Sequence, residues 1–168
     1  MIETFKTLFC VRSSLISLYL ALTIPIPFIS IERFKIPSII AFFLGLFLII
    51  NITNDYVNTC DKKVSYKTSF ISKILGKENW EILWRDIKQI KSFPTSQGSL
   101  VHYFITDYKE SFLVPQRIEN FEKFISVVEE KTNLDISKMT YISPLWTYKF
   151  LTYLSLLVLI VEIISLKI

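Results

Sequence analysis

Three long apolar stretches dominate the pattern of hydrophobic and polar positions along the chain. Residues 36–54 and residues 13–31 each pass 19 positions without a charged side chain. A helix rises about 1.5 Å per residue, so either stretch is long enough to cross a hydrocarbon core of about 30 Å. The third stretch, residues 145–166, carries Lys149 and Glu162 close to its ends. A helix that is apolar on every side has lipid as its natural solvent, so this pattern predicts three transmembrane helices.

The first two stretches predict an antiparallel hairpin. Pro25 and Pro27 lie near the end of the first stretch, where proline kinks or ends a helix, and the charged segment 32–35 supplies a tight turn. A cleaved signal peptide is the alternative for the first stretch, but it has no Ala-x-Ala exit and a second span follows at once. We therefore expect residues 1–54 to form an N-terminal transmembrane hairpin and residues 144–168 to form a C-terminal transmembrane helix.

The segment between these spans, residues 55–143, has a different character. It holds thirteen basic and twelve acidic residues, and its apolar residues form short runs. Several runs alternate between apolar and polar positions, as half-buried strands do; in the first of them Val64, Tyr66 and Phe70 share the apolar side. Short strands separated by turn-forming residues predict an antiparallel meander. The predicted strands are 64–70, 80–84, 87–93, 100–106 and 111–114.

After Pro115 the apolar period changes to that of a helix. A stripe of apolar residues lies opposite a charged face, and Asn133 is a candidate left-handed cap. A sheet with one face to bury, followed by a helix with an apolar stripe, predicts that the helix covers the sheet. The expected fold class is therefore membrane α+β, with three transmembrane helices and one antiparallel β domain closed by a helix. The stripe consists of Ile118, Phe121, Phe124, Ile125 and Val128.

The net charge of +4 is spread unevenly. Residues 62–91 hold eight basic residues against three acidic ones, directly after a predicted span, where anionic headgroups attract each lysine or arginine by about 1 kcal/mol. Nucleic acid is the alternative partner for a basic patch, but membrane tethering and the scattered spacing argue against it. The alternative to any contact site is an ordinary charged face of a sheet. The candidate contacts to a headgroup or a partner protein are Lys73, Lys77, Arg85, Lys88 and Lys91, with Trp80 and Trp84 between them.

The order of these elements resembles a known family. Strands, a W-x-D-I piece, a further strand pair around a turn and a closing helix follow one another as in the bacterial pleckstrin-homology-like domains of small membrane proteins, over roughly residues 54–135. The resemblance implies a strongly bent sheet or partial barrel that the helix closes at one end. That family is typically carried on one or two N-terminal spans, so the third span departs from its pattern. The residues that carry the resemblance are Trp84, Asp86, Ile87, Asp107, Pro115, Ile118, Phe121 and Phe124.

No group of residues indicates catalysis, a cofactor or a metal. His102 is the only histidine, and it has no serine or cysteine motif beside it, so we expect it on the solvent side of its strand. Cys10 and Cys60 lack the spacing of metal ligands, and the three glycines form no phosphate-binding loop. Asp86 is expected to satisfy backbone donors at its turn, with Trp84 inside the sheet. We therefore expect a protein that is not an enzyme.

The distribution of basic residues predicts an orientation. Basic residues precede the first span and flank the predicted β domain, against three on the opposite side, so the positive-inside rule places the N-terminus and the domain in the cytoplasm. We expect a multi-pass protein of the cytoplasmic (inner) membrane, and no residue distinguishes this from a thylakoid-type internal membrane. The first group is Lys6, Arg12, Lys62, Lys63, Lys138 and Lys149; the second is Arg33, Lys35 and Lys167.

Two functions fit these expectations. The first is a non-enzymatic integral membrane protein that presents a pleckstrin-homology-like interaction domain, as an assembly, scaffold or regulatory factor for a membrane complex. Its partners would be the lipid bilayer, another membrane protein and anionic lipid headgroups, and not nucleic acid. The alternative is an accessory subunit of a small transporter or membrane enzyme complex, in which the spans carry the activity through Glu162.

Overall fold

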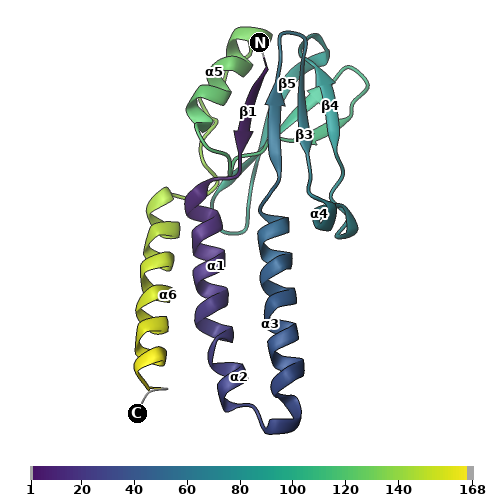
Figure 1. The fold of residues 1–168 in the computed structure, drawn as a ribbon. Helices are drawn as coiled ribbons and strands as arrows, with labels where there is room; N and C mark the ends of the chain where they lie inside the picture. The colour runs from purple at the N-terminus through teal and green to yellow at the C-terminus, as the bar shows by residue number, and fades with distance from the viewer. Residues whose placement is uncertain (1, 166–168) are drawn as a thin grey trace. The chain divides into compact units, whose positions relative to one another are not determined.

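The computed structural model describes residues 2–165 (Figure 1). The chain divides into two compact units. The β unit combines the N-terminal strand β1 (Glu3–Lys6) with the segment Asn54–Ser143, and the helical unit combines Phe9–Thr53 with the segment from Pro144 onward. The chain therefore starts the β unit, leaves it for the helices and returns to it.

The described part of the helical unit contains three helical stretches that are long and apolar enough to cross a membrane, which confirms the predicted pattern. The first consists of α1 (Phe9–Thr23) and α2 (Pro25–Ile29), which are separated at Ile24 because Pro25 has no N–H to donate into a continuing helix. The second is α3 (Glu32–Ile52), and the third is α6 (Leu145–Ser165).

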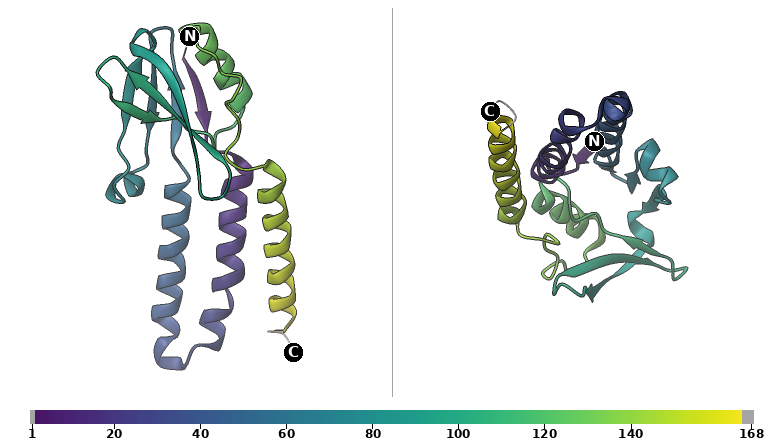
Figure 2. Two further views of the ribbon diagram at one scale, coloured as in Figure 1. Left: turned by 180° about the vertical axis from the view of Figure 1, so that it is seen from behind. Right: turned by 90° about the horizontal axis from the view of Figure 1, so that it is seen from below.

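Helix α1 lies between α3 and α6, as both views show (Figures 1 and 2). Its buried positions are mostly small, and Ser155 is the buried position of α6. Small side chains let helix backbones approach closely, and the hydroxyls of Ser14 and Ser17 donate to carbonyls of their own helix, so no donor is left bare. The buried residues of α1 are Val11, Ser14, Ser17 and Ala21.

A tyrosine and a glycine join α1 to α3. The Tyr19 hydroxyl donates to the carbonyl oxygen of Phe42 at 2.8 Å. A Cβ atom at Gly45 would overlap that tyrosine ring, so glycine is the residue that leaves room for it. The rest of α3 has no buried residue within the described chain, and Ile40, Phe43 and Phe47 are more than half exposed.

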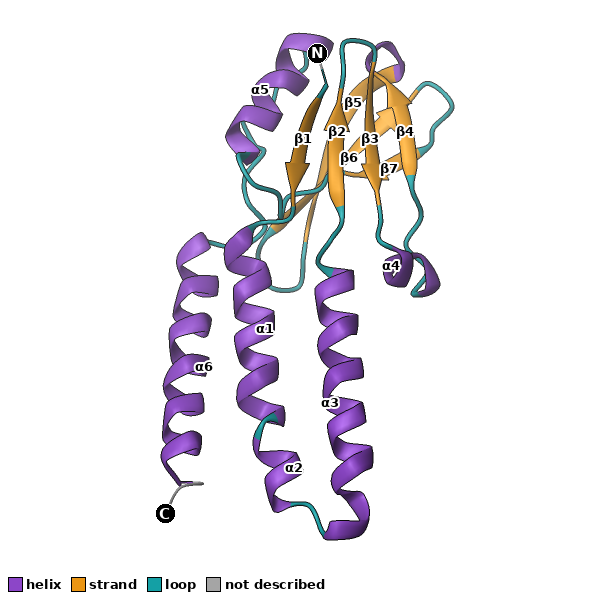
Figure 3. Cartoon of the chain, in the orientation of Figure 1, coloured by secondary structure: helices purple, strands orange, loops and turns teal. Residues whose placement is uncertain are grey.

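Within residues 2–165, the β unit contains seven strands in two antiparallel sheets (Figure 3). The four-stranded sheet has the order β1-β2-β3-β4 and the three-stranded sheet has the order β5-β6-β7. A short helix, α4 (Phe70–Ile74), lies between β3 and β4 in the chain, and a 3-10 turn, η1 (Trp84–Asp86), leads from β4 to β5. After β1, the strands are β2 (Tyr56–Thr59), β3 (Lys63–Lys67), β4 (Trp80–Leu83), β5 (Ile87–Pro94), β6 (Leu100–Thr106) and β7 (Ser111–Leu113).

Strand β1 pairs with β2 although the first two apolar stretches separate them in sequence. Phe5 lies opposite Val57 in this pairing, and both side chains are buried. Neither β1 nor β2 is among the strands predicted from the sequence. The predicted strand 64–70 also extends too far, because β3 ends at Lys67 and Phe70 lies in α4 with 73% of its surface exposed.

Helix α5 (Phe121–Thr132) carries four of the five residues of the predicted apolar stripe, whereas Ile118 lies before the helix, in an isolated β-bridge with Thr7. Phe124 is fully buried, and its ring meets that of Phe5 edge-on at 5.5 Å between centroids. Asn133 ends the helix with a φ of 55°, as predicted. The α5 residues share one hydrophobic core with residues of both sheets, and burial of each large apolar side chain contributes about 1.5–3 kcal/mol. The expected α+β architecture with antiparallel sheets is thus confirmed.

Candidate functional site

The five basic residues expected to form a contact site lie on different elements of the β unit. Lys73 lies in α4 and Lys77 just after it, before β4 begins, whereas Arg85 lies in η1, beyond the other end of β4. Lys88 and Lys91 lie on β5, in the other sheet.

Three of these five residues are held by carboxylates. The distances between nitrogen and oxygen are 2.8 Å for Lys77 and Asp55, 3.5 Å for Arg85 and Asp86, and 3.3 Å for Lys88 and Asp107. Among residues 2–165, Lys73 and Lys91 have no ion-pair partner. These two therefore carry the charge most available to an external anion.

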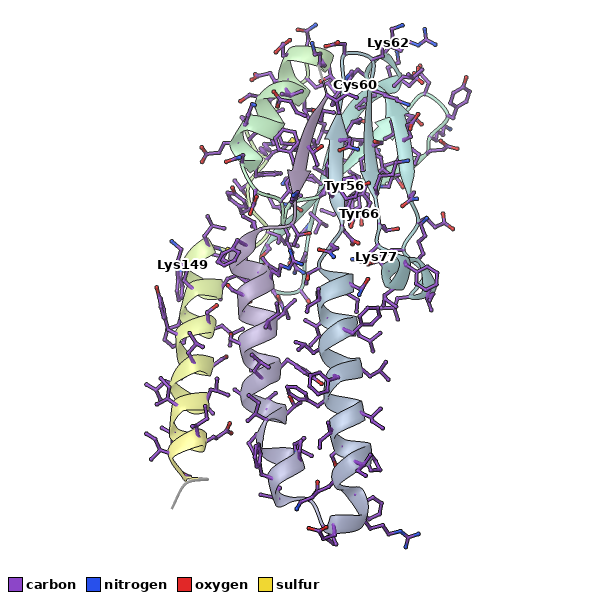
Figure 4. All side chains as sticks on the ribbon, in the orientation of Figure 1. Tyr56, Cys60, Lys62, Tyr66, Lys77 and Lys149 are labelled. Atoms are coloured by element: carbon purple, nitrogen blue, oxygen red, sulfur yellow. The ribbon has the colours of Figure 1, made fainter. Side chains whose placement is uncertain are left out.

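Asp55 accepts the hydrogen bonds of a polar cluster that includes Tyr66 and Lys77, both of which are labelled in Figure 4. Its carboxylate is 5% exposed; Oδ1 accepts from the Ser69 N–H at 2.9 Å, and Oδ2 accepts from the Tyr66 hydroxyl at 2.9 Å and from Lys77 Nζ at 2.8 Å. Burial opposes its charge, but the hydrogen bonds from Lys77, Ser69, Tyr66 and Ser72 outweigh burial and lower the pKa of Asp55. This Asp55 cluster ties the start of β2 to β3 and α4.

The Asp55 cluster also changes the pKa of Tyr66. Burial, together with the neighbouring Asp55 charge, raises the pKa of Tyr66, so its hydroxyl stays protonated as a donor. All the donors around Asp55 are supplied by the β unit itself, which makes the cluster a structural element. Asp55 is not among the candidate residues predicted from the sequence, because its partners Tyr66, Ser69 and Lys77 are 11–22 residues away.

A second polar feature is a small pocket between the outer strands of the two sheets. Its volume is about 200 Å³, and its walls come from β4, η1, the end of β6, the following turn and β7. β4 and β7 are each last in their sheet, so each has one backbone edge without a strand partner. We call it the β4–β7 pocket. It is lined by Glu81, Ile82, Leu83, Asp86, Thr106, Tyr108, Glu110 and Phe112.

Three acidic residues line the β4–β7 pocket, together with a threonine whose hydroxyl has no hydrogen-bond partner in the described chain. Glu81 pairs with Lys63 at 2.6 Å and Asp86 with Arg85, whereas Glu110 has no ion pair in the described part of the chain. Thr106 is 6% exposed, and its Oγ1 has no hydrogen-bond partner in residues 2–165. A buried hydroxyl without a partner is uncommon, because its desolvation is not compensated.

The structure confirms the prediction made for Trp84 and contradicts the one made for Asp86. Trp84 is 4% exposed, and its Nε1 donates to the Cys60 carbonyl at 2.7 Å, so its expected interior position is confirmed. Asp86 accepts no backbone hydrogen bond from the described residues and lies beside Arg85 instead, so its expected role at the turn is wrong.

The expectation that His102 faces solvent is also wrong. Its side chain is fully buried on the inner side of β6, and burial lowers its pKa. Its Nδ1 lies 2.8 Å from Oγ of Ser92, the residue directly opposite on β5, and its Nε2 has no partner among residues 2–165. A Ser–His pair of a hydrolase needs a third group that orients the imidazole, so this contact is explained as a cross-strand hydrogen bond.

The helical unit has a larger cavity beside the turn between α2 and α3. It measures about 450 Å³, and its walls are apolar except for Lys35, whose Nζ lies 2.8 Å from Glu32 Oε1. In α6, one carboxylate oxygen of Glu162 is buried without a hydrogen-bond partner in the described chain. No group of three or more histidine, cysteine or acidic residues among the described residues could hold a metal ion. The cavity is lined by Ile24, Pro27, Phe28, Lys35, Ile39, Phe42 and Phe43.

Comparison with known proteins identifies a relative but no activity. No protein-family model matches the chain. The chain is 25% identical over 148 residues to an uncharacterized protein of Synechocystis sp., and the match covers 84% of this chain and 74% of the other. Because 16% of the chain lies outside the match, a match of this length includes α3 and most of the β unit. The similarity therefore spans both units.

Proposed function

We propose that this chain is a non-enzymatic, multi-pass membrane protein that presents a pleckstrin-homology-like interaction domain, as an assembly, scaffold or regulatory factor for a membrane complex. The observation that carries the proposal is the position of β1. This strand precedes the helices in sequence, yet it pairs with β2 in the β unit. The chain thus passes three times between the two units, which suits a domain that is anchored to a membrane and not attached through one flexible tail.

The strand order supports the pleckstrin-homology-like assignment. Four strands and then three strands, in two antiparallel sheets, precede one helix that contributes to their common core. The resemblance implies a strongly bent sheet or partial barrel that a helix closes, and two antiparallel sheets that share one core with a helix are compatible with it. With this assignment the apolar helices α1, α2 and α3 are an insertion between the first and second strands of the domain.

Exposed apolar surface supports membrane insertion. Helix α3 has no buried residue in the described structure, so Ile40, Phe43 and Phe47 need a cover that water does not provide. Lipid is the medium that satisfies a helix that is apolar on all sides. The proposed orientation, with the β unit in the cytoplasm, follows the basic residues that flank that unit.

Insertion and orientation are tested together by chemical labelling of the full chain. In a background with Cys10→Ser and Cys60→Ser, single cysteines are introduced as Tyr108→Cys in the β unit and Arg33→Cys at the start of α3. The protein should stay in the membrane after an alkaline wash. A membrane-impermeant maleimide should label Arg33→Cys in intact cells, and Tyr108→Cys only after the membrane is opened. Release by the wash would reject membrane insertion, and the reverse labelling would reject the orientation.

The interaction role is tested by purification of the tagged full chain from its own membrane in a mild detergent. We expect another membrane protein to co-purify in a fixed molar ratio. The basic residues are tested by Lys73→Glu with Lys91→Glu, which should weaken that association, while Lys138→Glu serves as the control. A single species without protein partners would count against the interaction role, and full association of the double variant would remove these two lysines from the contact.

The second candidate, an accessory subunit of a transporter or membrane enzyme complex, is favoured by one observation. Glu162 has a buried carboxylate oxygen without a partner in the described chain, and an unpaired carboxylate in an apolar helix is unfavourable without a functional role. Glu162→Gln would then abolish the activity of the complex without loss of assembly. Full activity of this variant would reject the candidate.

A further inference from the structure

The β4–β7 pocket combines three features that together describe a ligand. Glu81, Asp86 and Glu110 line it and none of the lining residues is basic, so the charge of the lining is complementary to a cation. Thr106 also lines the pocket, and its buried hydroxyl oxygen has no hydrogen-bond partner within residues 2–165. Apolar groups complete the walls, so the ligand that fits has a positively charged end and an apolar stem.

The size and geometry of the pocket favour a side chain over other cations. A volume of about 200 Å³ is below the roughly 300–1,000 Å³ of typical small-molecule and cofactor sites. A metal ion is disfavoured because no three acidic, histidine or cysteine side chains in the described chain are arranged to bind one. Lysine and arginine side chains have the required apolar stem and charged end.

The surroundings of the pocket favour an extended segment as the carrier of that side chain. β4 and β7 flank the pocket, and each has an edge with no neighbouring strand in its sheet. Such edges bind extended peptides through backbone hydrogen bonds, while pockets beside them select side chains. Tyr108 is 83% exposed at the pocket and offers an aromatic surface to an incoming cation.

We propose that the β4–β7 pocket binds the lysine or arginine side chain of an extended segment that belongs to the partner membrane protein. This inference rests on the proposed interaction function and names its partner chemistry. The ion pairs of Glu81 with Lys63 and of Asp86 with Arg85 do not prevent binding, because all four side chains are at least one-third exposed and surface ion pairs contribute little. Glu110 does not have to give up an ion pair in order to bind an incoming cation, because it has no ion pair in the described chain.

The experiment uses photocrosslinking in the native membrane with the full chain. The photoreactive residue p-benzoylphenylalanine is incorporated at Tyr108, and in a parallel sample at Phe93 on β5, which is 50% exposed and does not line the pocket. Mass spectrometry of the crosslinked product identifies the partner segment. We expect crosslinking from position 108 to a segment that contains lysine or arginine.

Two variants then test the pocket itself. Glu110→Gln removes a charge, and Thr106→Val removes the unpaired hydroxyl at nearly constant shape; each should reduce crosslinking from position 108 about tenfold. Glu129→Gln on α5 makes the same change of charge as Glu110→Gln away from the pocket and should leave the yield unchanged. Thr106→Val should not lower the unfolding temperature, because the lost hydroxyl has no partner in the described chain. If Thr106 acted in folding alone, Thr106→Val would lower the unfolding temperature and leave the crosslinking yield unchanged.

The outcomes separate this inference from the proposed function. The pocket proposal fails and the interaction role stands if a partner co-purifies, or crosslinks from position 93, while no crosslink forms from position 108. An acidic or apolar segment at position 108, a lipid product, or a yield unaffected by Glu110→Gln and Thr106→Val also overturns the pocket proposal. If no partner is found at any position or by co-purification, the interaction role fails as well.

Discussion

Replacement of Asp55 by asparagine tests whether the Asp55 cluster holds the β unit together. The carboxylate is almost fully buried and accepts hydrogen bonds from Tyr66, Ser69 and Lys77. Asparagine keeps the shape but removes the charge and replaces one acceptor oxygen by a donor. At least one of the three donors then faces another donor inside the protein.

The magnitude follows from the exposure of each partner. A hydrogen bond to a charged acceptor contributes about 1.5–3 kcal/mol, but bonds to one acceptor are not additive. Lys77 is 49% exposed, so its share falls to the roughly 0–1 kcal/mol of a surface ion pair. We expect Asp55→Asn to lower the free energy of unfolding of the β unit by about 3 kcal/mol. Tyr66→Phe should cost about 1–1.5 kcal/mol and Lys77→Met about 1 kcal/mol or less.

The assay is urea unfolding of the full chain in detergent. Trp84 is buried in the β unit and reports its unfolding by fluorescence, whereas Trp146 in α6 is removed from the signal by Trp146→Phe in every protein compared. The reasoning is refuted if Asp55→Asn lies within about 0.5 kcal/mol of its parent, a change typical of surface substitutions. It is also refuted if Lys77→Met destabilises the β unit as much as Asp55→Asn.

The lowered pKa of Asp55 adds a test with pH. The ionised carboxylate is the form that the cluster stabilises, so its contribution is fully present above the unfolded pKa of about 3.9. It is lost as the pH falls below that value and through the pKa of the folded state. Between pH 5 and pH 3 the parent should therefore lose more stability than Asp55→Asn, and parallel curves would contradict the assignment.

Three further predictions concern other parts of the chain. Phe5→Ala should destabilise the β unit by about 3–5 kcal/mol in the same fluorescence assay, because Phe5 is 4% exposed; an unchanged midpoint would show that β1 is not part of the core. Burial lowers the pKa of His102, so the stability contributed by the neutral imidazole is present above about pH 6.5 and is lost below it. The free energy of unfolding should fall there by at most about 1.4 kcal/mol per pH unit. His102→Leu should abolish this pH dependence, and a pH dependence that persists in the variant would belong to another group. Gly45→Leu should destabilise the helices by about 1–3 kcal/mol, measured by thermal unfolding followed by circular dichroism in detergent, because a side chain at position 45 overlaps the Tyr19 ring. Tyr19→Ala in the same protein should restore part of the lost stability. Absence of this rescue would contradict the close contact of the two residues.

The apolar helices and the closing helix could be predicted because their patterns are local. A span without charges over 19 residues, or an apolar stripe that repeats every three to four positions, is complete within one element. The strands from β3 to β7 were recognisable for the same reason, although β3 was extended too far. Asn133 could be predicted as a cap because its left-handed conformation is a property of the residue type.

Strands β1 and β2 could not be predicted from local pattern. Each has four residues, and only Phe5 of β1 is buried, so neither shows an alternation long enough to recognise. Their pairing closes a loop of about fifty residues that contains two apolar stretches, and no local preference encodes it. The placement of His102 failed for a related reason, since both faces of β6 are rich in apolar residues and the register with β5 chooses the buried one.

The sequence by itself determined the classes of element in this protein: helices long and apolar enough for a membrane, short antiparallel strands and one amphipathic helix. It also determined where the basic residues lie along the chain, but not which of them remain unpaired. The tertiary structure alone decided that β1 pairs with β2, that Asp55 accepts hydrogen bonds from its distant donors and that Thr106 lines the same pocket as three acidic residues. The physical reason is that helix formation and apolar character depend on neighbouring residues, whereas strand pairing, buried hydrogen bonds and pockets depend on residues that only folding brings together.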